Sequence, residues 1–396
     1  MKEVIVERIP RDPADDYSPH IIAERRRFIE ERTQTELVHS SQFSIDPSST
    51  RGNIEHLTGI VQIPLGFAGP MLVAGEHARG EFYVPMGTTE GTLVASYGRG
   101  MRLTREVGGI KTTVVADAMQ RAPVFGFDDA RGANAFSLWV EANFAKIAEV
   151  AATSTRTGKL LKIERYIAAR FTFLRFNFST GDAAGQNLTS KATETACKWI
   201  LETYAELGHI RSFTLSGNMD TDKKASFINF LNTRGKRVIA EVTLPDELVR
   251  KYLHVSNQQM FESRLRSQIG AWMAGSTNNG SHAANAIAAI FIATGQDAAN
   301  VAESHAAVNY MDLLPNGDMY FAVTLPSLIV ATYGGGTGLP TQRECLEVLG
   351  CYGSGKVRKF AEIVTATVLC GELSLGAAVV AGEWVDAHER LGRNRP

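Results

Sequence analysis

The sequence predicts an α+β fold, in which a small inserted domain interrupts a large mixed α and β domain that follows a short helical segment. Three observations favour this fold. At 396 residues the chain is longer than a single hydrophobic core usually serves. Apolar residues follow the helical period in some segments and alternate strictly in others. The order of these patterns changes between about residues 122 and 213, where we place the insertion.

The first fifty residues are predicted to be the short helical segment. Residues 18–33 are rich in arginine and glutamate, and their apolar side chains are spaced for one face of a helix. Residues 51–75 are rich in glycine and proline and contain IVQIPLGFAGPMLVAG. That composition predicts short strands and turns.

A helix is predicted to begin at the run TTEGTLVASYGRGMRL, with Thr88 or Thr89 as its cap and Glu90 in its first turn. Three glycines lie inside this run. Each is about 1 kcal/mol less favourable than alanine in a helix. We therefore expect a ligand to approach the backbone closely at this point.

The inserted domain is predicted from an alternation of strands and helices over about ninety residues, which is the size of a ferredoxin-like domain. A strongly alternating strand with four phenylalanines is its clearest element. The predicted elements are a strand near 113–116, a helix near 134–152, the alternating strand at 170–178 and a helix at 190–207. The predicted boundaries are 1–50 for the N-terminal segment, 51–122 with 215–396 for the large domain, and 123–214 for the insertion.

The rest of the large domain is predicted to mix both element types, and it contains no internal repeat. Its predicted elements are a strand at 238–244, helices within 256–292, a strand at 319–325, the GGGTG run at 334–338 and a helical end at 359–390.

Composition excludes several classes of protein. Forty-one basic and forty-two acidic residues give a formal charge of -1, so no global field attracts nucleic acid or an anionic membrane. Four cysteines without a Cys-x-x-Cys pair argue against a zinc knuckle or a disulfide scaffold and favour a reducing cytoplasm. The charged N-terminus has no signal-peptide pattern, and glycines and Glu372 interrupt the longest apolar run, 364–380. We expect a soluble cytoplasmic protein with no metal site.

Nucleotide-binding fingerprints are absent, because neither G-x-G-x-x-G nor G-x-x-x-x-G-K-[ST] occurs. Two glycine-rich segments, 181–187 and 334–338, remain candidates for holding a pyrophosphate through free backbone amides. Each of them alone could equally be a plain tight turn.

Four polar stretches interrupt apolar sequence: TTEG at 88–91, SGNMDTDKK at 216–224, SHAANAIAAIFIATGQD at 281–297, and Asp386-Ala387-His388. Each alone has an ordinary structural explanation, such as a solvated turn, a helix cap or an exposed tail. Their order, together with IVQIPLGFAGP and YGGGTG, resembles the catalytic region of 3-hydroxy-3-methylglutaryl-CoA (HMG-CoA) reductase. The resemblance extends from about Glu55 to His388, and TTEG favours the biosynthetic class I type.

The resemblance implies four catalytic residues, Glu90, Lys223, Asp297 and His388. Reduction of a thioester to an alcohol takes two hydrides and builds negative charge on the carbonyl oxygen each time, so Lys223 is expected to stabilise an oxyanion. Glu90 would donate a proton to that oxygen, which requires a pKa raised by burial or by Asp297. His388 would protonate the departing CoA thiolate.

The resemblance also implies the binding residues, NADPH as cofactor with NADH less favoured, and CoA as part of the substrate. Arg156 and Lys159 could hold a ribose 2′-phosphate. The expected CoA contacts are Ser96, Arg99 and Arg102. The expected acyl-group contacts are Arg121, Ser216, Asp222, Lys224, Arg266, His282 and Asn285. The expected cofactor contacts are Thr155, Arg156, Asp182, Gly185, Asn187, Gly334, Gly335 and Gly336.

The implied reaction is NADPH-dependent reduction of (S)-HMG-CoA to (R)-mevalonate and free CoA. An NAD-linked oxidation of mevalonate and a catalytically silent CoA-thioester binding protein remain alternatives. Gly98 stands where the family has asparagine, and Arg266 stands where it has lysine. The resemblance further implies a homodimer or homotetramer with the site between subunits.

Overall fold

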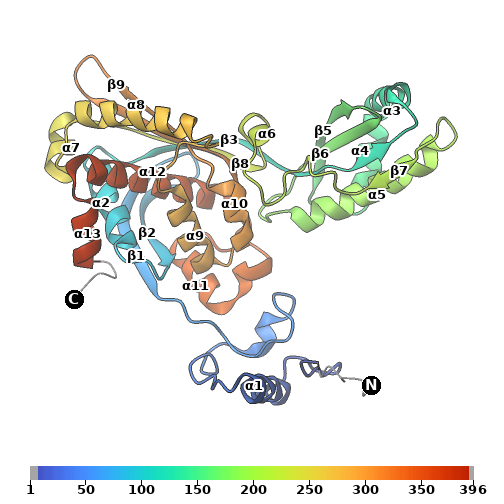
Figure 1. Cartoon of the computed structure of the whole chain (residues 1–396), viewed down its shortest axis with the longest axis horizontal. Coiled ribbons are helices and arrows are strands. Elements are labelled where there is room, and N and C mark those ends of the chain that lie inside the picture. Colours follow the sequence, from blue (N-terminus) through green and yellow to red (C-terminus); the bar gives the residue numbers. More distant parts are fainter. Residues whose placement is uncertain (1–7, 392–396) are drawn as a thin grey trace.

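The N-terminal segment is a separate small unit in the computed structural model, which describes residues 8–391. Helix α1 (Pro19–Thr33) begins where the Ser18 side chain accepts a hydrogen bond from the amide of Ile21. A short 3-10 helix, η1 (Pro47–Thr50), follows. The fully buried Arg25 side chain donates to the carbonyl oxygen of Leu57. Figure 1 shows this unit apart from the other helices and strands.

The strands form two antiparallel sheets. Strands β1 (Leu65–Ala74) and β2 (Arg79–Gly87) make a hairpin. The other eight strands follow the order β7-β4-β6-β3-β8-β10-β9, and β5 pairs with β6. Their bounds are β3 Lys111–Arg121, β4 Val124–Gly126, β5 Lys159–Ala168, β6 Phe171–Ser179, β7 Ser212–Thr214, β8 Gly235–Leu244, β9 Val308–Leu313 and β10 Met319–Leu328.

Strand β3 joins the two lobes of the molecule (Figure 1). Its first part, residues 111–118, pairs with β8 in the large lobe. Its last part, residues 119–121, pairs with β6 in the small lobe. The residues predicted as a strand of the insertion, 113–116, lie in the part that pairs with β8, so they belong to the large lobe.

The small lobe packs three helices on its strands: α3 (Ala130–Ala142), α4 (Phe144–Ala152) and α5 (Gln186–Tyr204). Buried Phe125, Phe176 and Phe178 contribute to its own hydrophobic cluster. The single helix predicted for 134–152 is wrong, because the Asn143 side chain donates to the Trp139 carbonyl oxygen at 2.8 Å and the helix is divided there. The prediction also missed β5, whose side chains are all partly or fully exposed, so that burial does not alternate along the strand.

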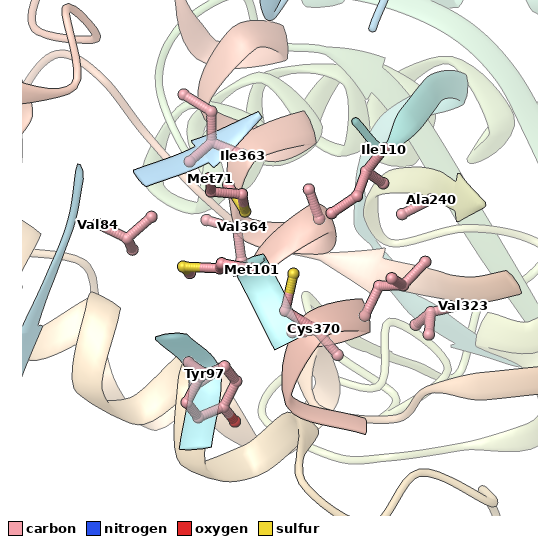
Figure 2. Packing of buried hydrophobic residues seen from close by; sticks show 14 of the residues in the cluster. Met71, Val84, Tyr97, Met101, Ile110, Ala240, Val323, Ile363, Val364 and Cys370 are labelled. Carbon is pink, nitrogen blue, oxygen red and sulfur yellow. The ribbon is translucent and has the colours of Figure 1, made fainter. Parts of the chain in front are cut away.

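The large lobe is built around α12 (Val357–Ala381). Met71, Met101 and Val364 are fully buried in one cluster, and Figure 2 shows them converging from β1, α2 and α12. By length and composition, helix α12 could cross a membrane, although glycines and Glu372 interrupt its apolar run. However, 78% of its apolar window is buried inside the protein, which is typical of a core helix.

The remaining helices surround this core. Their bounds are α2 Leu93–Glu106, α6 Phe227–Leu231, α7 Asp246–Leu253, α8 Asn257–Met273, α9 Ala283–Thr294, η2 Ala298–Asn300, α10 Val301–Ser304, η3 Gly335–Gly338, α11 Pro340–Val348 and α13 Trp384–Leu391. The predicted helical end at 359–390 is two helices, separated at Gly382, whose φ of +74° ends α12.

The helix predicted from Thr88 begins later, at Leu93. The Thr88 hydroxyl accepts a hydrogen bond from the Glu90 amide at 3.0 Å, which forms a local turn and not a helix cap. Thr92 has a φ of +70°, which a helical residue does not adopt. Glu90 therefore lies in the loop before α2, and its side chain is not part of a helix face.

Candidate active site

Helix α9 forms a wall that three neighbouring cavities share. A cavity of about 900 Å³ contacts Asn285 near the start of the helix. A second, of about 750 Å³, extends from Asn285 to Ile292. A third, of about 630 Å³, begins at Ile292 and includes Asp297 just beyond the helix. Volumes of this size suit ligands as large as cofactors. Because the three cavities follow one another along α9, an extended ligand could occupy more than one of them.

The first cavity holds the expected CoA contacts Ser96, Arg99 and Arg102, which α2 presents. The Ser96 hydroxyl donates to the hydroxyl of Ser374 at 3.1 Å. Arg99 donates to the same hydroxyl at 3.0 Å and forms an ion pair with Glu383 at 3.2 Å. Burial is the main cause of the lowered pKa of Arg99. Arg102 is exposed.

His282 is buried at the start of α9 and stacks on Tyr97, with 4.7 Å between ring centroids. Burial, with a smaller contribution from His388, lowers the pKa of His282 to about 4, so the ring is neutral at pH 7. Its Nδ1 lies 3.2 Å from the Asn285 amide nitrogen, which can only donate. In that arrangement Nδ1 accepts and Nε2 carries the proton. Nε2 is buried and has no hydrogen-bond partner among the residues that the structure describes.

Glu372 holds the first turn of α9 in place, and sequence reasoning missed this role. Its buried carboxylate accepts hydrogen bonds from the amides of Ser281, His282 and Ala283 at 2.6–2.9 Å. The Asn309 side chain donates to it at 2.8 Å. Burial raises the pKa of Glu372. A carboxylate at a helix N-terminus within otherwise apolar sequence was the signal available in the motif GELSL.

Glu90 and His388 both line the first two cavities. His388 lies on α13, where its Nδ1 is 2.7 Å from the Trp384 carbonyl oxygen. Glu90 is exposed, so one chain does not supply the burial expected for it. Within residues 8–391, no hydrogen bond or ion pair connects Glu90 to Lys223 or Asp297.

Lys223 and Asp297 form an ion pair, with 3.1 Å between the ammonium nitrogen and a carboxylate oxygen. Both side chains are partly exposed, by 46% and 40%. Lys223 has a φ of +56°, a conformation that costs free energy in a residue with a side chain. Its amide donates to the buried Glu303 carboxylate at 3.1 Å, which helps to hold this backbone.

A buried polar network lies behind Lys223, and sequence reasoning identified only part of it. Arg121 pairs with Asp220 at 2.8 Å, and the Ser216 hydroxyl donates to the same carboxylate at 3.0 Å. The fully buried Arg234 contacts Asp222 at 2.5 Å and also Glu303 at 3.2 Å. The predicted residues Arg121, Ser216 and Asp222 are therefore gathered, and Asp220, Arg234 and Glu303 join them.

Two other predicted acyl-group contacts lie on the surface. Lys224 donates to the Asp222 carbonyl oxygen at 3.0 Å, and its side chain is exposed beside Lys223. Arg266 is exposed on α8, and within residues 8–391 it forms no hydrogen bond or ion pair. One chain therefore does not bring Arg266 to the other predicted acyl-group contacts.

The two glycine-rich segments line the third cavity together. Gly185 directly precedes α5 and has a left-handed conformation, with φ at +87°. The exposed Asn187 lies in the first turn of α5. Gly334 and Gly335 have φ values of +83° and +58°, which favour glycine. Together with Gly336, these glycines line the cavity that also contains Asp297. Since they have no side chains, a ligand in the cavity can approach their backbone.

The remaining predicted cofactor contacts lie near this cavity or support it. The Asp182 carboxylate accepts hydrogen bonds from the amides of Gly355, Lys356 and Val357. It therefore holds in place the loop that leads into α12 and the first residue of that helix. The Thr155 hydroxyl accepts from the amide of Gly158, and exposed Arg156 lies in the same turn. A Cβ atom on Gly158 would lie 2.4 Å from Leu188, which lines the third cavity.

A lysine–aspartate ion pair, a neutral buried histidine and a glycine-lined cavity along one helix are features of an enzyme. The chain belongs to the hydroxymethylglutaryl-coenzyme A reductase family, because the model of that family matches residues 21–393.

Curated relatives agree. The 3-hydroxy-3-methylglutaryl-coenzyme A reductase of Methanocaldococcus jannaschii is 46% identical over 373 residues, which are 93% of this chain and 92% of the relative. The enzyme of the same name from Pyrococcus horikoshii is 43% identical over 377 residues, which cover 93% and 91%.

Solved structures share the fold. One of the class II HMG-CoA reductase from Streptococcus pneumoniae, bound to NADPH in open conformations, has a TM-score of 0.69 at 20% identity. It covers 90% of this chain and 97% of the other. Another structure of the reductase of that organism has a TM-score of 0.67 at 21% identity, with coverage of 90% and 96%. The neighbour whose name gives a class is of class II, so the fold comparison does not support the class I subtype expected from TTEG.

Proposed function

We propose that the chain catalyses NADPH-dependent reduction of (S)-HMG-CoA to (R)-mevalonate and free CoA. Membership of the reductase family supports this, and so do curated relatives with that name. The observation that carries the proposal is the Lys223–Asp297 ion pair at the edge of the glycine-lined cavity. A cation at that place meets the charge that develops on a carbonyl oxygen when hydride arrives.

The residues of the third cavity fit a dinucleotide. Glycines 334–336 leave backbone groups accessible to a pyrophosphate, and the turn with Thr155 and Arg156 lies beside Leu188. Two molecules of NADPH, bound one after the other, would each supply one of the two hydrides that the reaction consumes. Arg156, with Lys159, presents charge that suits a ribose 2′-phosphate, because guanidinium binds phosphate through paired donors. Asp182 acts through the loop that it anchors.

The chain's own side chains divide the proton chemistry. Lys223 stabilises the oxyanion at both hydride additions, and Asp297 holds its ammonium group in position. Glu90 donates a proton to the carbonyl oxygen. His388, at the junction of the first two cavities, protonates the CoA thiolate so that the thiol does not attack the aldehyde again. His282 and Asn285 bind the substrate from α9, and Arg99 and Arg102 hold the anionic CoA.

The active site is proposed to form between subunits of a homodimer or homotetramer. Glu90 forms no hydrogen bond or ion pair with Lys223 or Asp297 among the residues that the structure describes, and this supports a site that a second subunit completes. Helix α8 has an apolar exposed face, with Ile269, Trp272 and Met273 exposed by 60%, 81% and 76%. Apolar faces of this kind mark protein interfaces. Arg266 on the same helix would then reach the partner's site.

The domain boundaries are proposed as 1–50, 51–122 with 215–396, and 123–214. Separate hydrophobic clusters in the large lobe and in the insertion support the boundaries at 122 and 214. The N-terminal cluster of Ile21, Ile22 and Leu57 extends past residue 50. We interpret the insertion as ferredoxin-like. The succession β4, α3 with α4, β5, β6, α5, β7 follows the β-α-β-β-α-β pattern, and the strands lie in the order β7-β4-β6-β5.

The reaction is proposed to run in the biosynthetic direction in the cytoplasm, as in the class I enzymes. The motif TTEG supports this direction. A strong preference for NADH would instead indicate oxidation of mevalonate.

The test is incubation of the purified chain with HMG-CoA and NADPH, following NADPH absorbance and free thiol together. Two molecules of NADPH should disappear for each thiol released, and NADH should be a poorer substrate. Lys223→Ala protein, prepared in the same way, is the control for contaminating activity. Thiol release without NADPH consumption would contradict a reductase.

A further inference from the structure

A cluster of possible metal ligands lies at the turn that joins β1 and β2, outside the three cavities along α9. The turn contributes Glu76 and His77, and α12 contributes Glu362. One potential ligand atom from each residue lies within 4.8 Å of the other two. Glu76 is also within 3.4 Å of the Thr113 hydroxyl on β3. Segments far apart in the sequence therefore place an imidazole and two carboxylates together.

The carboxylate of Glu362 is fully buried and only half satisfied. One oxygen accepts hydrogen bonds from the amides of His77 and Ala78, at 2.9 and 2.7 Å. The other oxygen is buried and has no hydrogen-bond partner. In the part of the chain that the structure describes, Glu362 forms no ion pair. A buried carboxylate without a compensating charge is strongly unfavourable.

A second polar atom at this place also lacks a partner. The Thr112 hydroxyl is buried and forms no hydrogen bond. A Cβ atom on Gly75 would lie 2.1 Å from that hydroxyl oxygen and 2.4 Å from Oε2 of Glu362, the oxygen that accepts from the two amides, so both groups border the same glycine. Only glycine leaves room at this position. Two incompletely satisfied buried oxygens therefore adjoin the exposed Glu76 and His77.

We propose that Glu76, His77 and Glu362 bind a divalent transition-metal ion, with zinc as the best match. Zinc binds imidazole nitrogen and carboxylate oxygen at about 2.0–2.2 Å. The exposed side chains of Glu76 and His77 can change rotamer to approach an ion at that distance. An imidazole ligand favours zinc over magnesium or calcium, which prefer oxygen ligands throughout. The ion supplies the positive charge that Glu362 lacks.

The ion would have a structural role. It joins the β1–β2 turn to α12, the central helix of the large lobe. Glu362 precedes Glu372 by ten residues on this helix, which is about 15 Å along the axis. The metal therefore stabilises the fold near the hairpin, and the reductase chemistry does not use it.

The experiment is calorimetric titration of zinc chloride into chelator-treated full-length protein, with thermal unfolding measured in parallel. Wild-type protein should bind one more zinc ion per chain than His77→Gln protein. Zinc should raise the thermal midpoint of the wild type more than that of the variant, because a ligand that binds the folded state stabilises it. Glu76→Gln and Glu362→Gln should weaken binding at this site by at least about tenfold.

His20→Gln is the matched control, since His20 is also exposed and lies beside a glutamate, Glu24, at 3.7 Å. This variant should bind zinc as the wild type does. Glu76 and His77 are exposed, so their variants remain informative even where Glu362→Gln fails to fold. Equal zinc binding by wild type and His77→Gln would overturn the proposal.

Discussion

The ammonium nitrogen of Lys223 lies 3.1 Å from a carboxylate oxygen of Asp297 at the edge of the glycine-lined cavity. The two residues come from different parts of the chain, a loop with strained backbone and the segment after α9. Asp297 also accepts a hydrogen bond from the Ala299 amide at 3.0 Å, which orients its carboxylate. The pair therefore fixes a positive charge beside the proposed cofactor site.

Replacement of Lys223 by alanine should abolish reduction of both HMG-CoA and mevaldehyde, because an oxyanion develops in each step. We expect kcat to fall by about 10²–10³ for either substrate. Steady-state assays with each substrate test this. Lys224→Ala is the comparison, since it removes a charge from the same turn and should mainly raise KM. Equal losses of kcat in the two variants would contradict the role of Lys223.

His388→Gln should separate the two halves of the reaction. Thioester reduction should fall by about 10²-fold, since the thiolate loses its proton donor, whereas mevaldehyde reduction should be nearly unchanged. The ratio of the two rates is the measurement. The assigned role is wrong if both activities decline equally.

His282 should make stability depend on pH. Its folded-state pKa is about 4, below the ordinary value of 6.5, because the charged ring is poorly solvated. The unfolded chain therefore binds more protons between these values. This contribution to stability is present above pH 6.5 and is lost as pH falls toward 4.

We expect the pH dependence to be smaller in His282→Gln protein. From pH 7 to pH 5 the free energy of unfolding of the wild type should fall by about 2 kcal/mol more than that of the variant. Urea denaturation at the two pH values measures this difference. His20→Gln, which changes an exposed histidine, should behave as wild type. Parallel pH profiles for wild type and His282→Gln would show that the ring is not neutral in the fold.

Glu372→Ala should destabilise the protein by about 3–5 kcal/mol, because it leaves buried amides of α9 without an acceptor. Glu372→Gln keeps an acceptor and should cost less. Urea denaturation at pH 7 measures both. Glu347→Ala removes an exposed partner of Arg343 and should cost less than about 1 kcal/mol. A similarly small loss for Glu372→Ala would refute the anchoring role.

Arg156→Ala should weaken the binding of NADPH but not that of NADH, because the guanidinium is assigned to the 2′-phosphate that NADH lacks. We expect KM for NADPH to rise by about tenfold, with kcat little changed. Cofactor titrations at saturating HMG-CoA give both constants. A parallel rise for NADH would place Arg156 elsewhere on the cofactor.

Sequence patterns predicted the elements whose side chains alternate or repeat strongly. The alternating phenylalanines of 170–178 became β6, because one face of that strand is buried in the small lobe. The pattern failed for β5, an edge strand whose exposed side chains need no alternation. It also placed Glu90 inside a helix, because threonine at 88 resembles a cap although it closes a local turn.

The sequence by itself determined which residue types were available for reduction, since Glu90, Lys223, Asp297 and His388 lie in motifs that can be read in order. The tertiary structure decided which of them meet. It paired Lys223 with Asp297, left Glu90 apart within one chain, and placed Glu372 under the first turn of α9. The physical reason is that charge pairing and burial depend on distances in space, which local patterns of residues do not encode.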